Sequence, residues 1–345
     1  MNLKLAQHAE RFGLTMVDPE LFAIERRRSG KGHKVCFSSG EKVIDKRLKA
    51  RIKALVIPPA WTNVRICVEE NGHIQAIGRD EKGRLQYRYH DDWVNVRNAV
   101  KTERLLRFGR ALPRLRRRIA KDLRRRTVDR LSTSAVATRL IDVAAMRPGH
   151  EKYAEDGGRG VASLRKQNLR IVKKVAVLKF VGKSNKENRI EIADKALVRS
   201  LQRVREGKGQ RLFRFPDAKK KQRELTANLL NEYLREAAQA RISAKDFRTF
   251  HGSAEALRYL IEETEGADTD SKRKRAVAKA MRSVSQVLRN TPAVARSSYV
   301  HPEIVEAFEA ERLPKDLLKG RQREGLTRVE TGLMRFLEEV ARQAE

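Results

Sequence analysis

Residues 56–90 read VIPPAWTNVRICVEENGHIQAIGRDEKGRLQYRYH, and apolar and polar side chains alternate along them. Such alternation is typical of strands with one buried face. Two turn signals interrupt it, Glu70-Asn71-Gly72 and Asp80-Glu81-Lys82-Gly83. The segment therefore predicts a meander of short strands joined by hairpins, with one or two helices before it.

The apolar spacing becomes helical from about Asp91 onward. The clearest helix is TVDRLSTSAVATRLIDVAAM, residues 127–146. We expect it to end near Arg147, because Pro148 disfavours the helical conformation of the residue before it and Gly149 follows.

Two short strand patterns follow this helix, KKVAVLKFVG (173–182) and RIEIA (189–193). Beyond Pro216 the pattern is helical almost to the C-terminus, and we expect helices near residues 221–238, 252–263, 272–289 and 322–343. The periodicities together predict an α+β protein of two domains. Residues 1–90 would form a small β-rich N-terminal domain, and residues 91–345 a larger, mainly α-helical domain with a small antiparallel sheet.

The charge balance points to a polyanionic partner. The chain carries 77 Lys and Arg against 44 Asp and Glu, a net charge of +33. Residues 101–130 hold 13 basic and 3 acidic side chains at amphipathic helical spacing. One interpretation is a solvated basic helix. The other is a helix lying against a phosphate backbone, with the following arginines on its polar faces: Arg116, Arg117, Arg124 and Arg125.

Several classes of protein are excluded by composition. Two cysteines, Cys36 and Cys67, cannot build a disulfide scaffold or a four-cysteine zinc site. No apolar run reaches the roughly 18 residues of a membrane span, and the N-terminus lacks the apolar core of a signal peptide. Neither histidine spacing nor an acidic cluster indicates a catalytic metal. We therefore expect a soluble protein of the cell interior, with no membrane contact.

Four short motifs carry residues suited to breaking a phosphodiester bond without a metal ion. That reaction needs a nucleophile, fixed cations for the non-bridging oxygens and a proton donor for the leaving alkoxide. Arginine suits the second role because its planar guanidinium stays cationic and binds phosphate oxygens in pairs. The motifs are RPGHEKY (147–153), FVGK (180–183), KDFRTFH (245–251) and NTPAVARSSY (290–299).

In this order the motifs resemble those of the type IB DNA topoisomerases, in particular the poxvirus-like branch also found in bacteria. The resemblance runs from about residue 30 to about 302 and includes IPPAWTNVRI (57–66) and GRDEKGRLQYRYH (78–90). It implies the fold shared by tyrosine recombinases and type IB topoisomerases. It also implies a monomer, associated with the nucleoid, that acts on double-stranded DNA. Such an enzyme relaxes positive and negative supercoils without ATP, metal or any other cofactor.

The resemblance assigns a role to each residue that matches a family motif. Tyr299 would be the nucleophile that forms a 3′-phosphotyrosyl linkage, and Arg147 and Arg248 would clamp the non-bridging oxygens. Lys183 would be the general acid for the 5′ oxygen, and Asn290 would donate a further hydrogen bond. Position 290 is His in the viral enzymes and many relatives; Asn still donates but cannot be cationic. Residues that would touch DNA or support the site are Gln86, Tyr87, Tyr89, Lys152, Tyr153 and Lys245.

Purely structural interpretations of the same residues remain open. Arg248 could form an ion pair with Asp246, Asn290 could cap the helix after it, and the face shared by Tyr87 and Tyr89 could be core. Two other functions also remain. A tyrosine recombinase would use the same chemistry, although recombinases usually carry His-x-x-Arg where this chain has Lys-x-x-Arg, and their N-terminal domain is usually helical. A non-catalytic nucleic-acid-binding protein would explain the charge alone.

Overall fold

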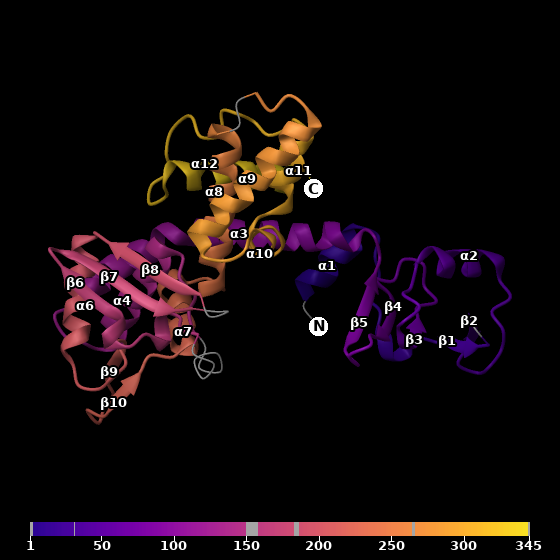
Figure 1. Cartoon of the computed structure of the whole chain (residues 1–345), viewed down its shortest axis with the longest axis horizontal. Coiled ribbons are helices and arrows are strands. Elements are labelled where there is room, and N and C mark those ends of the chain that lie inside the picture. Colours follow the sequence, from indigo (N-terminus) through magenta and orange to yellow (C-terminus); the bar gives the residue numbers. More distant parts are fainter. Residues whose placement is uncertain (1–2, 31, 150–157, 183–185, 264–265, 344–345) are drawn as a thin grey trace. The chain divides into compact units, whose positions relative to one another are not determined.

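The computed structural model describes residues 3–30, 32–149, 158–182, 186–263 and 266–343 (Figure 1). Packing groups the chain into two compact units, Met1–Lys101 and Thr102–Glu345. Strands dominate the first unit and helices the second, so the predicted α+β class is confirmed.

The predicted domain boundary at residue 90 lies earlier than the division between these units. The difference arises in helix α3 (Trp93–Leu123), which begins within the first unit. Its residues Trp93 and Val96 share a small apolar cluster with Ala9 and Leu14, so the start of α3 packs with the N-terminal residues.

An antiparallel sheet of five strands forms the first unit, in the order β2-β1-β3-β4-β5. The predicted turns at 70–72 and 80–83 connect β3 to β4 and β4 to β5, so the hairpin meander is confirmed. In the second turn Gly83 adopts a left-handed φ of 73°, and its N–H donates to the Asp80 carbonyl (2.8 Å). The elements are α1 (Leu3–Arg11), β1 (Ile24–Ser29), β2 (Gly32–Phe37), α2 (Lys46–Ala54), β3 (Thr62–Ile66), β4 (Ile74–Arg79) and β5 (Leu85–Tyr89).

Helices pack around two small sheets in the second unit. The sheets are β6-β7-β8, built from Leu169–Val172, Val175–Val181 and Glu187–Ile192, and the pair β9 (Arg214–Pro216) and β10 (Gln222–Glu224). The helices after α3 are α4 (Arg130–Ala144), α6 (Lys195–Glu206), α7 (Ala227–Ala238), α8 (Ala244–Glu262), α9 (Asp270–Leu288), α10 (Pro292–Tyr299), α11 (Pro302–Glu309) and α12 (Arg328–Gln343).

Three of the predicted helix boundaries differ from the structure as follows, and two short helices were not predicted. Helix α4 ends at Ala144 rather than near Arg147, because Ala145 takes a left-handed conformation. The block at 221–238 begins with strand β10, and α8 begins at Ala244 rather than at residue 252. A capping box between Ser243 and Asp246 starts α8 early. Helices α10 and α11 were not predicted; each has only eight residues, too few for periodicity to reveal.

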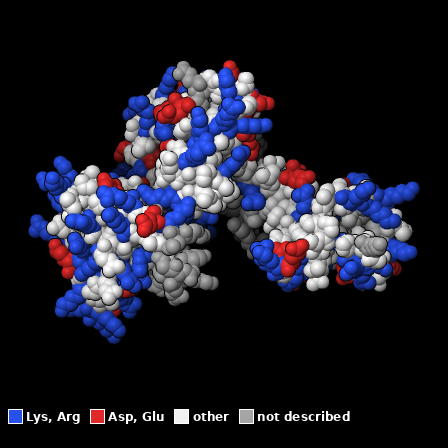
Figure 2. Space-filling view, in the orientation of Figure 1, with Lys and Arg blue, Asp and Glu red and all other residues white. Residues whose placement is uncertain are grey.

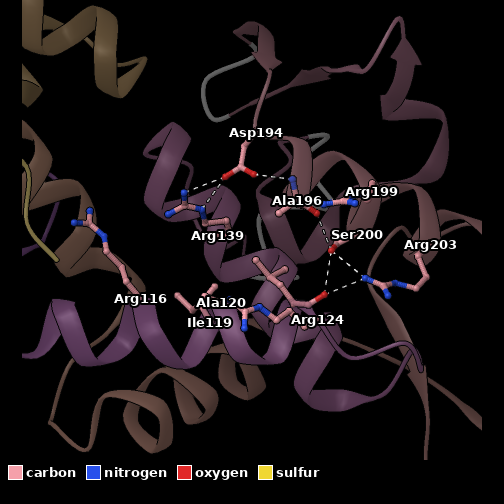
Figure 3. Close-up of a pocket in the computed structure, with 11 residues that line it drawn as sticks. Arg116, Ile119, Ala120, Arg124, Arg139, Asp194, Ala196, Arg199, Ser200 and Arg203 are labelled. Atoms are coloured by element: carbon pink, nitrogen blue, oxygen red, sulfur yellow. Dashed lines mark hydrogen bonds and ion pairs between the residues drawn. The ribbon is translucent and has the colours of Figure 1, made fainter.

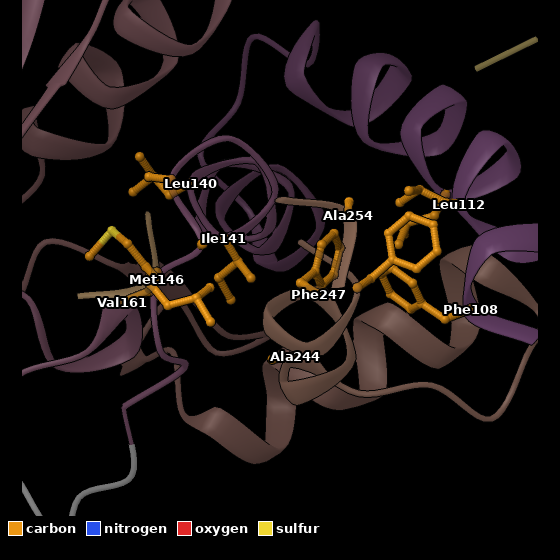
Figure 4. Close-up of a cluster of buried hydrophobic side chains, with 14 of the residues drawn as sticks. Phe108, Leu112, Leu140, Ile141, Met146, Val161, Ala244, Phe247 and Ala254 are labelled. Atoms are coloured by element: carbon orange, nitrogen blue, oxygen red, sulfur yellow. The ribbon is translucent and has the colours of Figure 1, made fainter. Parts of the chain in front are cut away.

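One large apolar core holds the second unit together (Figure 4). Phe108 of α3 packs edge-on against Phe247 of α8, with 4.9 Å between their ring centroids. Leu140 and Ile141 bring α4 into the same core, and the C-terminal helix α12 adds Leu333 together with its neighbours. The core therefore fixes α4 and α8, the two helices that lead into the candidate site.

A buried ion network reinforces this packing and overturns the interpretation of Arg116 as a surface residue. Arg116 contacts Asp142 of α4 and Glu330 of α12, each at 2.8 Å. Arg139 also reaches Asp142 (3.0 Å). Burial alone would raise the pKa of Asp142, but the hydrogen bonds and charge of Arg116 outweigh it and hold the pKa below its usual range.

Replacing the Asp142 carboxylate should destabilise the second unit in a pH-dependent way. Because the folded pKa is lowered, Asp142 contributes fully above the ordinary Asp pKa of about 3.9 and loses its contribution as pH falls through the folded value. Asp142→Asn should cost about 3 kcal/mol at neutral pH, since Arg116 and Arg139 lose their shared buried partner.

Urea unfolding at neutral and acidic pH measures this effect. The gap between the wild type and the variant should narrow as the pH is lowered. Glu236→Gln, which removes an exposed ion pair with Arg130, is the control and should cost less than about 1 kcal/mol. An Asp142→Asn cost that does not change with pH would contradict this account of the network.

Candidate active site

Tyr299 and Arg248 form the centre of the site. Tyr299 is the last residue of α10, and Arg248 lies on α8 with only 2% of its surface exposed. The Arg248 guanidinium lies over the Tyr299 ring, 4.7 Å from its centroid. The two residues are separated by 51 positions in the sequence (299 − 248), and the short helix α10 brings them together.

Arg248 is held by backbone carbonyls rather than by a carboxylate. Its guanidinium donates to the carbonyl of Ala145, just after α4, and to that of Leu288 at the end of α9 (2.8 Å). Helix ends leave carbonyls without intrahelical partners, so a buried arginine can satisfy them. Asp246 instead pairs with Arg104, so the alternative of an Arg248–Asp246 ion pair is wrong.

The electrostatics of this pair favour a reactive phenol. Burial would raise the pKa of Tyr299, but the positive charge of Arg248 outweighs it, and Arg147 and Lys245 add to the effect, so the pKa is lowered. Burial lowers the pKa of Arg248 to about 10, and repulsion from Arg147 contributes to this shift. The structure therefore brings Arg147, Arg248, Lys245 and Tyr299 together, as the motifs predicted.

Gly149 and Gly160 are in close backbone contact next to Arg147. Gly149 and Gly160 touch through their backbones: a Cβ on Gly149 would lie 2.8 Å from the Gly160 Cα. The Arg147 carbonyl accepts a hydrogen bond from the Val161 N–H (2.9 Å). Gly149 also has a left-handed φ of 82°. These contacts fix the backbone of Arg147 at the edge of the site.

Asn290 has unused hydrogen-bonding capacity. Both polar atoms of its side-chain amide are buried and have no partner within the described part of the chain. Thr291, not Asn290, caps α10, because its side chain accepts from the Val294 N–H (3.3 Å). The capping interpretation of Asn290 is therefore wrong. A buried amide without a partner is costly, which is consistent with a ligand that supplies one.

Three of the predicted residues lie outside the described residues: Lys183, Lys152 and Tyr153. Gly182, the neighbour of Lys183, lies at the end of the hairpin formed by β7 and β8 and donates to the Lys186 carbonyl (2.7 Å). It lines a small pocket together with Arg147 and Arg248. The last described residue before Lys183 therefore lies in the wall of the same pocket.

Sequence reasoning missed two arginines of this pocket, Arg159 and Arg289. Arg159 donates its backbone N–H to the Val181 carbonyl (2.8 Å) and so ties the hairpin to the segment after Arg147. Neither residue belongs to a resembling motif as quoted. The one available signal is that Arg289 directly precedes Asn290.

The predicted DNA-contacting tyrosines lie on β5 in the first unit. Their rings stack on the same face, with centroids 5.9 Å apart, and Tyr89 also stacks on Trp93 at 5.8 Å. Tyr87 is exposed, whereas Tyr89 packs partly into the core, so the core interpretation holds for Tyr89 alone. Gln86 donates to Asp80 (2.8 Å).

Basic side chains cover much of the visible surface of both units (Figure 2). A separate groove of about 600 Å³ is lined by α3, α4 and the start of α6 (Figure 3). Arg139 there contacts Asp194 (3.0 Å), and Arg203 donates to the Leu123 carbonyl (3.1 Å). Within the described residues Arg124 and Arg199 make no ion pair, so they remain available to a polyanion.

The described residues were also compared with the requirements of a metal site and of a membrane span. No three His, Cys, Asp or Glu side chains among them gather closely enough to hold a metal ion. None of the described helices has the length and apolar character that a membrane span requires.

Gly252 of α8 controls how closely Tyr299 approaches Arg248. A Cβ at this position would lie 2.8 Å from the Tyr299 carbonyl oxygen and 3.2 Å from the Tyr299 Cβ. Gly252→Ala should therefore displace Tyr299 even though alanine favours the helix. The reaction expected from the four motifs, attack of Tyr299 on a phosphodiester bond, should slow by about 100-fold in a single-turnover assay, because an error of about 1 Å in geometry has that effect.

Gly32→Ala is the matched control, since a Cβ there has only one neighbour within 4 Å, at 3.9 Å. It should leave the rate unchanged. Wild-type cleavage by the Gly252→Ala variant would show that the close approach of the two backbones is not required.

Comparisons with known proteins agree with this geometry. The family described as "Eukaryotic DNA topoisomerase I, catalytic core" matches residues 91–321, and "Bacterial DNA topoisomerase IB, N-terminal domain" matches residues 36–80. The DNA topoisomerase 1B of Acanthamoeba polyphaga mimivirus is 31% identical, over 79% of this chain and 83% of the viral one. That of Vaccinia virus (strain Copenhagen) is 23% identical, over 67% of this chain and 71% of its own. The chain thus belongs to the type IB DNA topoisomerases.

Proposed function

We propose that this enzyme relaxes positive and negative DNA supercoils through a transient single-strand break in which Tyr299 becomes joined to the 3′ phosphate. The observation that carries the proposal is the Tyr299 phenol lying against Arg248, with its pKa lowered: burial opposes ionisation, and Arg248, Arg147 and Lys245 outweigh it. A free tyrosine with a pKa of about 10 is almost fully protonated at neutral pH. The lowered pKa favours the phenolate that attacks phosphorus.

Each residue of the four motifs is assigned a separate role in the cleavage step. Arg147, Arg248 and Asn290 are described by the structure, whereas Lys183 takes its role from the resemblance alone. The Tyr299 oxygen forms a bond to phosphorus, and the bond from phosphorus to the 5′ oxygen breaks as Lys183 gives that oxygen a proton. Arg147 and Arg248 stabilise the charge on the non-bridging oxygens, and Asn290 donates a further hydrogen bond. The phosphotyrosyl ester conserves the energy of the broken bond. The free 5′ hydroxyl can then reseal the strand without ATP or metal, after torsion has driven strand rotation.

The proposed partner is double-stranded DNA, bound by a monomer associated with the nucleoid. The net charge of +33 and the exposed ring of Tyr87 support a phosphate-rich partner. Gln86, Tyr89, Lys152, Tyr153 and Lys245 are proposed to contact DNA or support the site. The five-stranded sheet of the first unit favours a topoisomerase over a recombinase, whose N-terminal domain is usually helical.

Tyr299→Phe should abolish relaxation while leaving DNA affinity nearly intact. The variant keeps the ring beneath Arg248 and loses only the oxygen that attacks phosphorus. The measurement is relaxation of supercoiled plasmid in EDTA without nucleotide, together with covalent adducts trapped by detergent. Tyr259→Phe on α8 is the control and should relax plasmid normally. Residual relaxation by Tyr299→Phe would refute the nucleophile assignment.

Lys183→Ala should slow cleavage by about 10² to 10⁴-fold, the range that general acids contribute. A DNA substrate with sulfur at the 5′ bridging position should restore much of the rate, because a thiolate leaves without a proton. Lys179→Ala, an exposed lysine on strand β7 of the same hairpin, is the control and should behave as wild type. If sulfur fails to rescue Lys183→Ala, Lys183 is not the acid.

A further inference from the structure

Arg289 has an unfavourable backbone conformation. It follows the last residue of α9 and adopts a left-handed φ of 53° and ψ of 55°. Glycine is the usual residue at such a helix end, because a Cβ makes this conformation costly. Here the chain carries a long cationic side chain instead. Ala145 and Gln239 adopt the same conformation at other helix ends, so the backbone alone does not distinguish Arg289. Its side chain makes a contact that glycine cannot make.

That contact is with the end of α4. Arg289 donates from Nη1 to the carbonyl of Ala144, the last residue of this helix, at 2.6 Å. The next carbonyl, that of Ala145, accepts from Arg248. Two arginines therefore bind two successive carbonyls, and Arg147 follows only two residues later. The segment that carries Arg147 is held from α8 and α9 at once.

Arg289 is also an uncompensated cation. Burial lowers its pKa, and it lines the small pocket with Arg147, Arg159 and Arg248. Among the described residues no carboxylate lines this pocket. Elsewhere in the same unit, Arg116 is paired with carboxylates, whereas the buried Arg214 is held by backbone carbonyls, as Arg289 is. A partly desolvated arginine bound by neutral carbonyls is costly for stability. What sets Arg289 apart from Arg214 is its place in one pocket with Arg147 and Arg248, which points to a role in the reaction.

We propose that Arg289 is a positioning residue for cleavage: it holds the end of α4 so that Arg147 is presented correctly to the scissile phosphate. The inference rests on the proposed function, in which Arg147 stabilises the transition state. Arg289 does not need to touch DNA in this scheme. Its effect passes through the Ala144 carbonyl to the backbone of Arg147, so it should alter the rate of cleavage and not the affinity for DNA.

Arg289→Gly tests the proposal without adding backbone strain, because glycine suits the left-handed conformation. At saturating DNA, single-turnover cleavage should fall about 100-fold, the cost of a misplacement of about 1 Å. DNA affinity, measured by gel shift with a non-cleavable duplex, should stay within about twofold. Arg289→Lys should recover much of the rate, since an ammonium group can also donate to the Ala144 carbonyl. Gln239→Gly makes the same backbone change at the end of α7 and should have no effect.

A double-mutant cycle with Arg147→Ala distinguishes positioning of Arg147 from a purely structural role. The quantity measured is the loss of cleavage rate caused by Arg289→Gly with and without Arg147. If Arg289 acts through Arg147, Arg289→Gly should slow cleavage little further once Arg147 is absent. An equal loss in both backgrounds would overturn the proposal, as would a loss of affinity with an unchanged rate. Adduct formation by the wild type separates failure of the proposed function from failure of the proposed role of Arg289. If it forms no detergent-stable adduct with DNA, the proposed function fails, whereas an active wild type with an equally active Arg289→Gly variant refutes the role of Arg289 alone.

Discussion

The candidate site depends on one buried guanidinium, that of Arg248. It joins the carbonyls at the ends of α4 and α9 and lies over the ring of Tyr299. Three segments far apart in the sequence therefore meet at a single side chain. If Arg248 were absent, two helix ends would each keep a buried carbonyl without a partner, and the phenol would lose its nearest cation. The same position of Arg248 therefore satisfies the helix-end carbonyls and places a cation beside the Tyr299 phenol.

Carboxylates are distributed unevenly around the arginines of the second unit. Asp142 and Glu330 neutralise Arg116, and this network secures α3, α4 and α12 around the core. Within the described residues, the pocket around Arg248 and Arg289 has no such carboxylate. Repulsion among its arginines is therefore unrelieved in the free protein, and an incoming phosphate removes it. In the proposed mechanism, the repulsion among these arginines favours binding of the negative charge that develops on phosphorus.

Sequence reasoning found what depends on local pattern and on motifs, and it missed what depends on packing. The strand meander before residue 90 and the helix of residues 130–144 follow from periodicity, which is a local property. Arg116 was assigned to a polar helix face because of the helical spacing of the apolar residues around it. No pattern reveals that Asp142 and Glu330 fold back onto it. Gly252 gave no signal either, because its importance lies in the backbone of Tyr299, which only the tertiary fold brings near.

The neutral Asn290 fits the electrostatics of the pocket better than a cation would. Arg147, Arg248 and Arg289 already repel one another, and the lowered pKa of Arg248, caused by burial and by Arg147, records part of that cost. A protonated histidine at position 290 would add another positive charge to a partly desolvated site. An amide donates a hydrogen bond without that penalty. The polar atoms of Asn290 are buried and have no partner among the described residues, so its amide N–H groups are available to a bound ligand. In the proposed mechanism the arginines therefore stabilise charge, and Asn290 contributes a directed hydrogen bond.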